Sequence, residues 1–240
     1  MPVALITGAN GGLGRAIAES LATEHGCHVI ISSRNAAEGK AVAVSLLQRG
    51  FSASSIQIDL SSDESIHKAV KNIEAAHDEL HVLVNNAGVH LEITDTDLST
   101  RQLLNQTFQA NTFGTAVLIE ACLPLLLRAD TPRIVFVSSR NGSISQSLDR
   151  DWPMYGVQHP AYKASKAALN MLAVRYVEKL EGVGGMVNMV CPGFVKSKMV
   201  GFHPDARSPE VAAEKVVEMA TLEKDGPTGT FVDADGSVPW

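Results

Sequence analysis

Short apolar runs alternate with longer segments of helical periodicity along the whole chain. The apolar runs predict strands buried on both faces of a sheet, at residues 3–7, 28–32, 55–59, 81–85, 133–138, 186–191 and 229–232. The segments between them predict helices, at residues 14–25, 36–49, 63–77, 100–128, 161–181 and 208–222. This alternation favours an α/β fold with a doubly wound parallel sheet of about seven strands and helices on both faces.

The domain organisation follows from the same pattern. A chain of 240 residues suits one α/β domain spanning residues 1–240, and it shows no internal repeat or flexible linker. The least regular stretch, residues 140–160, lies between a predicted strand and a predicted helix, so we interpret it as an insertion within the domain. Its aromatic residues either wall a substrate pocket or simply anchor the loop.

Charge and cysteine usage exclude several function classes. The net charge is −6, so there is no basic surface for nucleic acid to bind. No apolar run is long enough to span a membrane, and the N-terminus lacks a signal peptide pattern. The three cysteines form no Cys-x-x-Cys pair, which is typical of buried thiols in a reducing compartment. We therefore expect a cytoplasmic protein without a metal, nucleic-acid or membrane partner.

A glycine-rich loop follows the first predicted strand and leads directly into a helix. Glycines in this context let the backbone approach a pyrophosphate, while the helix N-terminus offers free N–H groups. Glycines also occur in tight turns for steric reasons alone, but the strand–loop–helix order favours a dinucleotide site. The predicted cofactor contacts in this loop are Thr7, Gly8, Asn10, Gly12, Leu13 and Gly14.

The end of the second predicted strand indicates which cofactor is bound. Ser33 and Arg34 stand where an NAD enzyme usually has a carboxylate, so nothing there repels a 2′-phosphate and Arg34 can pair with one. One charged hydrogen bond of about 1.5–3 kcal/mol would favour NADP by roughly ten- to over a hundredfold. Alternatively, Arg34 is a solvated loop cation. Asp59 and Leu60 could contact the adenine, although Asp59 could equally cap the following helix.

Tyr162 and Lys166 are four residues apart and therefore share one face of a predicted helix. A lysine ammonium roughly 5 Å from the phenol would lower the tyrosine pKa by ~2 units. A tyrosine whose pKa is lowered in this way can exchange a proton with a carbonyl or alcohol oxygen. The alternative is a half-buried ring with a surface lysine, since this spacing is common in helices.

Several motifs together resemble those of the short-chain dehydrogenase/reductase family over essentially the whole chain. In order, they are Thr7-Gly-x-x-x-Gly12-x-Gly14, Asn85-Asn86-Ala87-Gly88, Ser138-Ser139, Tyr162-x-x-x-Lys166 and Pro192-Gly193. The resemblance implies a Rossmann-type sheet and a nicotinamide-dependent oxidoreductase. It also implies further cofactor contacts, at Asn86, Ala87, Gly88, Tyr162, Lys166, Pro192, Gly193, Val195 and Ser197.

The resemblance further implies a catalytic set of four residues. Tyr162 would be the general acid/base, and Lys166 would bind the nicotinamide ribose as well as activating Tyr162. Ser139 would polarise the substrate oxygen, and Asn111 would hold a water in a proton relay through Lys166. Without the family, Asn111 and Ser139 read as ordinary structural residues.

The C-terminal part resembles the NADPH-dependent carbonyl reductase branch of the family, with three departures. Ser197 replaces the usual threonine, Gly11 replaces a basic residue of the glycine loop, and Ser139 and Tyr162 are 23 residues apart, an intermediate spacing. The predicted function is NADPH-dependent reduction of a ketone or aldehyde, or oxidation of the alcohol. The alternatives are a tailoring enzyme of the same fold acting on a specialised pathway intermediate, and a catalytically silent NADP-binding regulator.

Family members commonly dimerise through the two long helices predicted at residues 100–128 and 161–181. A longer insertion covers this surface in the carbonyl reductase branch. We therefore expect a monomer rather than a homodimer, with residues 140–160 covering the outer face of the second helix. The physiological substrate, its stereochemistry and the direction of the reaction do not follow from the sequence.

Overall fold

The computed structural model, which describes residues 1–95 and 97–240, contains one sheet at its centre. The strand order is β3-β2-β1-β4-β5-β6-β7-β8, as expected for a doubly wound fold. The strands are β1 (Val3–Ile6), β2 (His28–Ser33), β3 (Ala53–Gln57), β4 (Val82–Asn85), β5 (Arg133–Val137), β6 (Met186–Val190), β7 (Thr230–Asp233) and β8 (Gly236–Ser237). This arrangement confirms the predicted α/β class.

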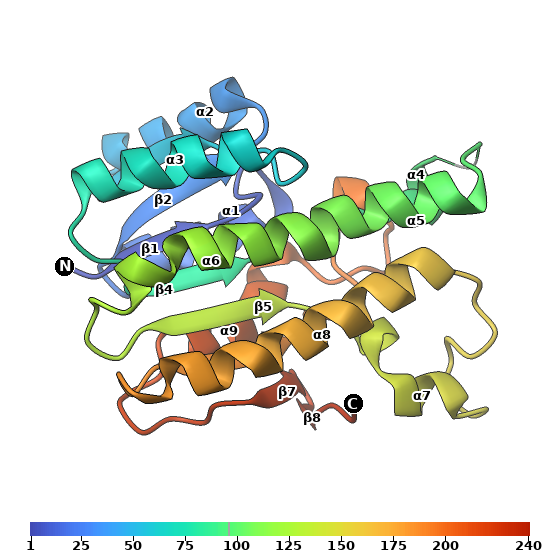
Figure 1. Ribbon diagram of the computed structural model, residues 1–240. Coiled ribbons are helices and arrows are strands. Elements are labelled where there is room, and N and C mark those ends of the chain that lie inside the picture. Colours follow the sequence, from blue (N-terminus) through green and yellow to red (C-terminus); the bar gives the residue numbers. More distant parts are fainter. Residues whose placement is uncertain (96) are drawn as a thin grey trace.

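Helices cover both faces of the sheet, so the protein has two hydrophobic cores (Figure 1). The helices are α1 (Gly12–Thr23), α2 (Ala36–Gln48), α3 (Asp63–Ala76), α4 (Leu91–Thr94), α5 (Thr100–Phe108), α6 (Gly114–Leu126), α7 (Ile144–Leu148), α8 (Pro160–Glu181) and α9 (Pro209–Ala220). The layer of α3, α6 and α8 packs on one face, and α1, α2 and α9 pack on the other. Within the described residues, no helix is both long and apolar enough to cross a bilayer.

The strand predictions needed two small corrections. The sheet has eight strands and not seven, because the chain turns back after β7 and adds the two-residue antiparallel strand β8. Strand β3 also begins two residues earlier than predicted and ends at Gln57. The prediction followed the apolar Ile56 and Ile58, whereas this edge strand alternates in burial and pairs with β2 through its polar residues as well.

The helix predicted at residues 100–128 forms, but a π-helical turn at Gln109–Phe113 interrupts it. Asn111 is buried in this turn. Gly114 begins α6 immediately afterwards, where an added Cβ would lie 1.8 Å from the Leu60 carbonyl oxygen. Only glycine allows this close contact between the helix and the loop. π-Helical turns occur frequently at functional sites.

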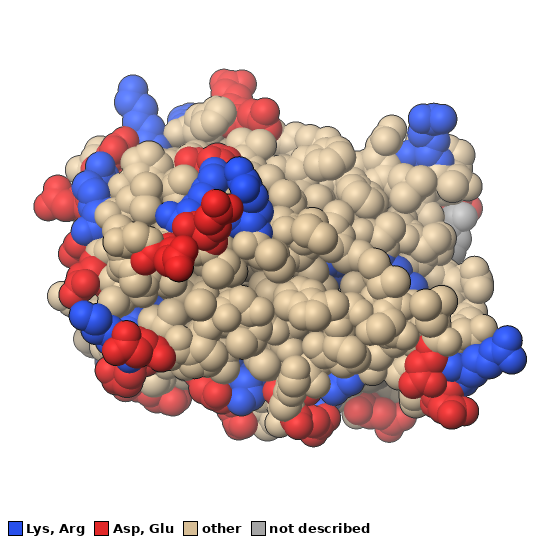
Figure 2. Space-filling view, turned by 60° about the horizontal axis from the view of Figure 1, so that its bottom comes forward, with Lys and Arg blue, Asp and Glu red and all other residues tan. Residues whose placement is uncertain are grey.

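The insertion at residues 140–160 lies between β5 and α8, and it contains the short helix α7. It packs near the N-terminal end of α8, where Lys163 Nζ lies 5.4 Å from the centre of the Trp152 ring. Farther along α8, Met171 is 72% exposed and Val174 is 44% exposed. Figure 2 shows a continuous uncharged area across the middle of the side that carries α8, β7 and β8. The expectation that the insertion covers the outer face of α8 is therefore wrong for these residues.

Candidate active site

A cavity of about 1700 Å³ opens at the carboxyl ends of the parallel strands. It lies where the strand order reverses between β1 and β4, the position at which doubly wound sheets bind ligands. The predicted cofactor residues and Ser139, Tyr162 and Lys166 all line this cavity. Asn111 lies behind the cavity wall, in the π turn. Residues from seven separate segments of the chain thus converge on one site.

Hydrogen bonds between two adjacent strand ends hold the glycine loop in place. The Thr7 hydroxyl accepts hydrogen bonds from the backbone N–H groups of Asn86 and Ala87, both at 2.9 Å. The Asn86 amide donates to the Thr7 and Gly8 carbonyl oxygens at 2.8 and 3.3 Å. Helix α1 then begins after Gly11 without a side-chain cap, so its first N–H groups remain available to an anion.

The adenosine end of the cavity contains a carboxylate that the sequence interpretation missed. Glu38 lines the cavity, and its carboxylate accepts hydrogen bonds from Asn10 Nδ2 at 2.6 Å and from Asn35 Nδ2 at 3.1 Å. Arg34 is exposed and lines the same cavity. The carboxylate lies in the first turn of α2, where the helix dipole favours negative charge. The Glu38 carboxylate therefore lines the same cavity as Arg34, the cation expected to bind the 2′-phosphate.

Asp59 uses its carboxylate locally. It accepts hydrogen bonds from the Ser61 backbone N–H at 2.9 Å and from the Ser61 hydroxyl at 2.6 Å, and these bonds lower its pKa. Ser62, not Asp59, caps helix α3. The helix-cap alternative for Asp59 is therefore wrong, and the residue instead shapes the turn next to Leu60.

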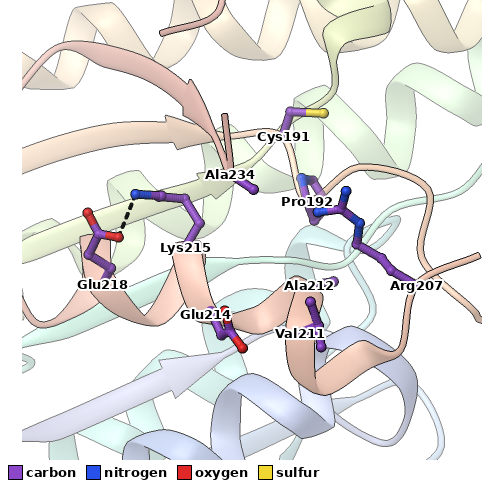
Figure 3. Close-up of a pocket in the computed structure, with 9 residues that line it drawn as sticks. All are labelled: Cys191, Pro192, Arg207, Val211, Ala212, Glu214, Lys215, Glu218 and Ala234. Atoms are coloured by element: carbon purple, nitrogen blue, oxygen red, sulfur yellow. Dashed lines mark hydrogen bonds and ion pairs between the residues drawn. The ribbon is translucent and has the colours of Figure 1, made fainter. Parts of the chain in front are cut away.

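The opposite end of the cavity is formed by the segment after β6. Gly193 has a φ of +78°, a conformation that favours glycine. Behind this turn lies a smaller pocket of about 240 Å³. There the Arg207 side chain lies against Pro192, and Lys215 pairs with Glu218 (Figure 3). Ser197 approaches the glycine loop, because an added Cβ on Gly12 would lie 3.7 Å from the Ser197 Cβ.

Tyr162 and Lys166 lie on the same face of α8, as predicted, but their pKa values shift away from the charged forms. Lys166 Nζ lies 5.8 Å from the centre of the Tyr162 ring and donates to the Val137 carbonyl oxygen at 2.8 Å. Burial lowers the pKa of Lys166 to about 8. Burial also raises the pKa of Tyr162 to about 12, against the opposing hydrogen bond with Ser139. The expected lowering of the Tyr162 pKa is therefore wrong for the protein without cofactor.

The Asn111 side chain makes three structural hydrogen bonds. Its Oδ1 accepts from the Val89 N–H at 2.7 Å, and its Nδ2 donates to the Val89 carbonyl at 2.9 Å and to Ser165 Oγ at 3.0 Å. Both amide protons are thus committed, so the side chain could hold a water only through the second lone pair of Oδ1. Gly88 permits the close approach, because an added Cβ would lie 3.2 Å from Asn111 Oδ1.

A second group beside Tyr162 was also not identified from sequence. The His90 ring stacks on the Tyr162 ring at a centroid distance of 4.0 Å and an interplanar angle of 13°. His159 packs edge-on against His90 at 4.5 Å. Only the position of His90, two residues beyond Gly88, could have drawn attention to it, and single histidines carry little signal.

Comparison with known proteins agrees with this geometry. Residues 2–207 match the family model described as short chain dehydrogenase. The short-chain dehydrogenase/reductase ATR10 of Stachybotrys chlorohalonatus is 32% identical, covering 98% of this chain and 88% of that protein. Carbonyl reductase (NADPH) 1 of Mus musculus is 29% identical, and the match covers 100% of this chain and 98% of that protein.

Solved structures extend the agreement to three dimensions. The Pseudomonas aeruginosa RhlG/NADP active-site complex has a TM-score of 0.82 and 26% identity, and it covers 98% of this chain and 95% of that chain. The oxidoreductase yciK from E. coli has a TM-score of 0.83 and 25% identity, and the match covers 97% of this chain and 94% of that chain. With the glycine loop, the sheet order and the family model all in agreement, the chain belongs to the short-chain dehydrogenase/reductase family.

Proposed function

We propose that this protein is an NADP(H)-dependent oxidoreductase that reduces a ketone or aldehyde, or oxidises the corresponding alcohol, with Tyr162 as the general acid/base. The observation that carries this proposal is the position of Ser139, Tyr162 and Lys166 in the same cavity as the glycine loop. The likeness to an NADPH carbonyl reductase over the full chain supports the same reaction class.

The residues at the dinucleotide end fit NADP. An added Cβ on Gly14 would lie 2.5 Å from the Gly8 carbonyl oxygen, so only glycine allows this close packing of helix and loop. The free N–H groups of α1 and the exposed Arg34 supply positive charge for phosphate groups. When bound, the nicotinamide supplies or accepts hydride.

The chain's own residues would manage the substrate oxygen and its proton. Tyr162 and Ser139 line the same cavity, so both hydroxyls can face one carbonyl oxygen. Lys166 Nζ has further protons beyond the one donated to Val137, and these are available to ribose hydroxyls. We propose that Tyr162 transfers the proton, Ser139 polarises the oxygen and Lys166 anchors the cofactor.

The cofactor assignment is tested by steady-state kinetics with NADPH and NADH. We expect NADPH to be preferred by the wild type, and Arg34→Ala to reduce kcat/KM for NADPH much more than for NADH. Equal use of NADH and NADPH by the wild type would show that the assignment of Arg34 is wrong.

The catalytic assignment is tested by NADPH absorbance decay with quinones, aldehydes and cyclic ketones. We expect Tyr162→Phe to lose mainly kcat, since the hydroxyl acts chiefly in the transition state. Lys166→Ala should lose both kcat and cofactor affinity. Cofactor binding without turnover of any substrate would favour the silent regulator instead.

The protein's compartment is also a proposal. All three cysteines are buried free thiols, which suits a reducing compartment such as the cytoplasm. Alkylation of the denatured protein isolated from its native cells would test this, because all three thiols should react without prior reduction.

A further inference from the structure

Three polar side chains from separate segments gather behind Tyr162, outside the catalytic set. His90 lies in the loop after β4, Glu92 lies in α4, and His159 immediately precedes α8. The His90 and Glu92 side chains are 8% and 7% exposed. Burying polar groups costs free energy unless they make compensating interactions, so their placement beside a reactive phenol calls for a physical explanation.

Glu92 caps the helix that carries Tyr162. Its Oε1 accepts a hydrogen bond from the Tyr162 backbone N–H at 2.9 Å. The residue at the N-cap position of α8, His159, supplies no side-chain cap of its own. A distant carboxylate therefore takes over a role that a neighbouring residue usually fills, and it fixes where α8 begins relative to the cavity.

The second oxygen of Glu92 faces His90. Glu92 Oε2 lies 4.0 Å from His90 Nε2, and neither atom has a hydrogen-bond partner among the described residues. His159 Nδ1, on the ring packed edge-on against His90, is also without one. A contraction of about 1 Å would turn the His90–Glu92 approach into a hydrogen bond, which would fix the orientation of the imidazole.

The phenol ring has two close neighbours. The His90 imidazole lies nearly parallel to the ring, and the Lys166 ammonium lies 5.8 Å from its centre. A planar partner limits rotation of the phenol about its side-chain bonds. Because the Tyr162 hydroxyl has to meet a substrate oxygen within hydrogen-bond reach, such a limit affects the chemical step more than cofactor binding.

We propose that His90 is a positioning residue for Tyr162, with Glu92 orienting its imidazole and capping α8. The His90 ring holds the phenol in the plane from which its hydroxyl reaches the substrate. Glu92, as the nearby negative charge, opposes formation of the phenolate. This proposal rests on the proposed function for its kinetic consequence, although its effect on the Tyr162 pKa does not depend on turnover.

The ionisable groups around Tyr162 are Lys166, Cys191, Glu92 and His90, with His159 packed behind His90. Burial and the Cys191 and Glu92 charges raise the pKa of Tyr162. Burial, with the neighbouring His159, lowers the pKa of His90 to about 4, so its imidazole is neutral at pH 7. The stack on Tyr162 is therefore between two uncharged rings near neutral pH.

The experiment compares a planar and a non-planar replacement of His90. His90→Phe keeps a flat ring, whereas His90→Leu has no planar group to stack. We expect His90→Leu to lower kcat by roughly 10- to 100-fold, the scale of a misplaced catalytic group, with NADPH affinity unchanged. His90→Phe should recover most of that loss. His67→Phe, an exposed histidine on α3, is the matched control and should behave as wild type.

An absorbance titration supplies a readout that needs no substrate. The alkaline difference spectrum between the wild type and Tyr162→Phe reports the phenolate of Tyr162 in the cofactor-free protein. Glu92→Gln keeps an oxygen for the Tyr162 N–H but removes the charge, so the Tyr162 pKa should move down from about 12. Thermal melts identify any variant that does not fold.

The outcomes separate the two proposals. If no carbonyl compound is reduced by the wild type, the proposed function fails, while the Glu92→Gln titration still decides whether the cluster acts on Tyr162. Equal kcat losses in folded His90→Phe and His90→Leu would overturn the role of the planar stack. An unchanged Tyr162 pKa in Glu92→Gln would overturn the role of Glu92.

Discussion

Replacing Gly14 by alanine should separate the cofactor loop from the helix that follows it. The new Cβ would lie 2.5 Å from the Gly8 carbonyl oxygen and 2.4 Å from Asn86 Nδ2. Ordinary contact begins near 3.4 Å, so helix and loop must part by 0.9 Å. Overpacking of this kind, together with loss of the two Asn86 hydrogen bonds, costs about 2–6 kcal/mol. In a domain of this size that lowers the melting temperature by roughly 4–24 °C.

Differential scanning fluorimetry with and without NADPH measures both the loss of stability and the loss of cofactor binding. Gly14→Ala should melt earlier and should lose most of the NADPH-induced shift, because the displaced loop no longer presents its backbone to phosphate. Gly11→Ala is the control, since a Cβ there meets nothing within 4 Å. A Gly14→Ala protein with wild-type melting and a full NADPH shift would refute the assignment of this loop.

Three further predictions concern charge and assembly. Glu38→Gln should tighten NADPH binding by roughly fivefold, about 1 kcal/mol for a partly exposed charge near Arg34, and leave NADH binding unchanged in fluorescence titrations. Because the folded pKa of Lys166 is about 8, below its unfolded value of about 10.4, the unfolded state binds more protons between these values. Denaturant unfolding should therefore show the wild type gaining about 3 kcal/mol relative to Lys166→Met as pH rises through this window. Finally, Met171 and Val174 are exposed on α8, so in place of the monomer expected from the sequence we predict association through this helix. Light scattering should report a dimer of about 51 kDa, twice 25.5 kDa, and Met171→Glu should dissociate it; a wild-type monomer at every concentration would contradict this.

The fold and the main site residues were predictable because their signals are local. A strand that is buried on both faces must be apolar, and a loop that approaches a phosphate must contain glycine, so both requirements are written into short stretches of sequence. Parallel strands carry their loops to one edge of the sheet, which brings the glycine loop, Ser139 and Tyr162 together. The order of elements was therefore enough to place them in one cavity.

The remaining features depend on contacts between distant segments. His90 and Glu92 gain significance only because α4 packs beside the start of α8, 70 residues later in the chain. The contact of Gly114 with the Leu60 carbonyl and that of Trp152 with Lys163 likewise join separate segments. None of these contacts has a periodicity or a spacing that reveals it.

The pKa of Tyr162 shows how an argument from spacing can give the wrong sign. The four-residue separation does bring Lys166 close to the phenol, but burial is the largest influence on the pKa of Tyr162, and it raises that pKa. Burial acts on both groups against their charged forms, so the pKa of Tyr162 rises and that of Lys166 falls. The pair is therefore not activated by proximity alone. Activation must come from groups that enter the cavity and from the removal of opposing charge. Glu92 is the carboxylate whose charge adds to burial in raising the pKa of Tyr162, so the Glu92→Gln titration measures how much of that rise comes from charge.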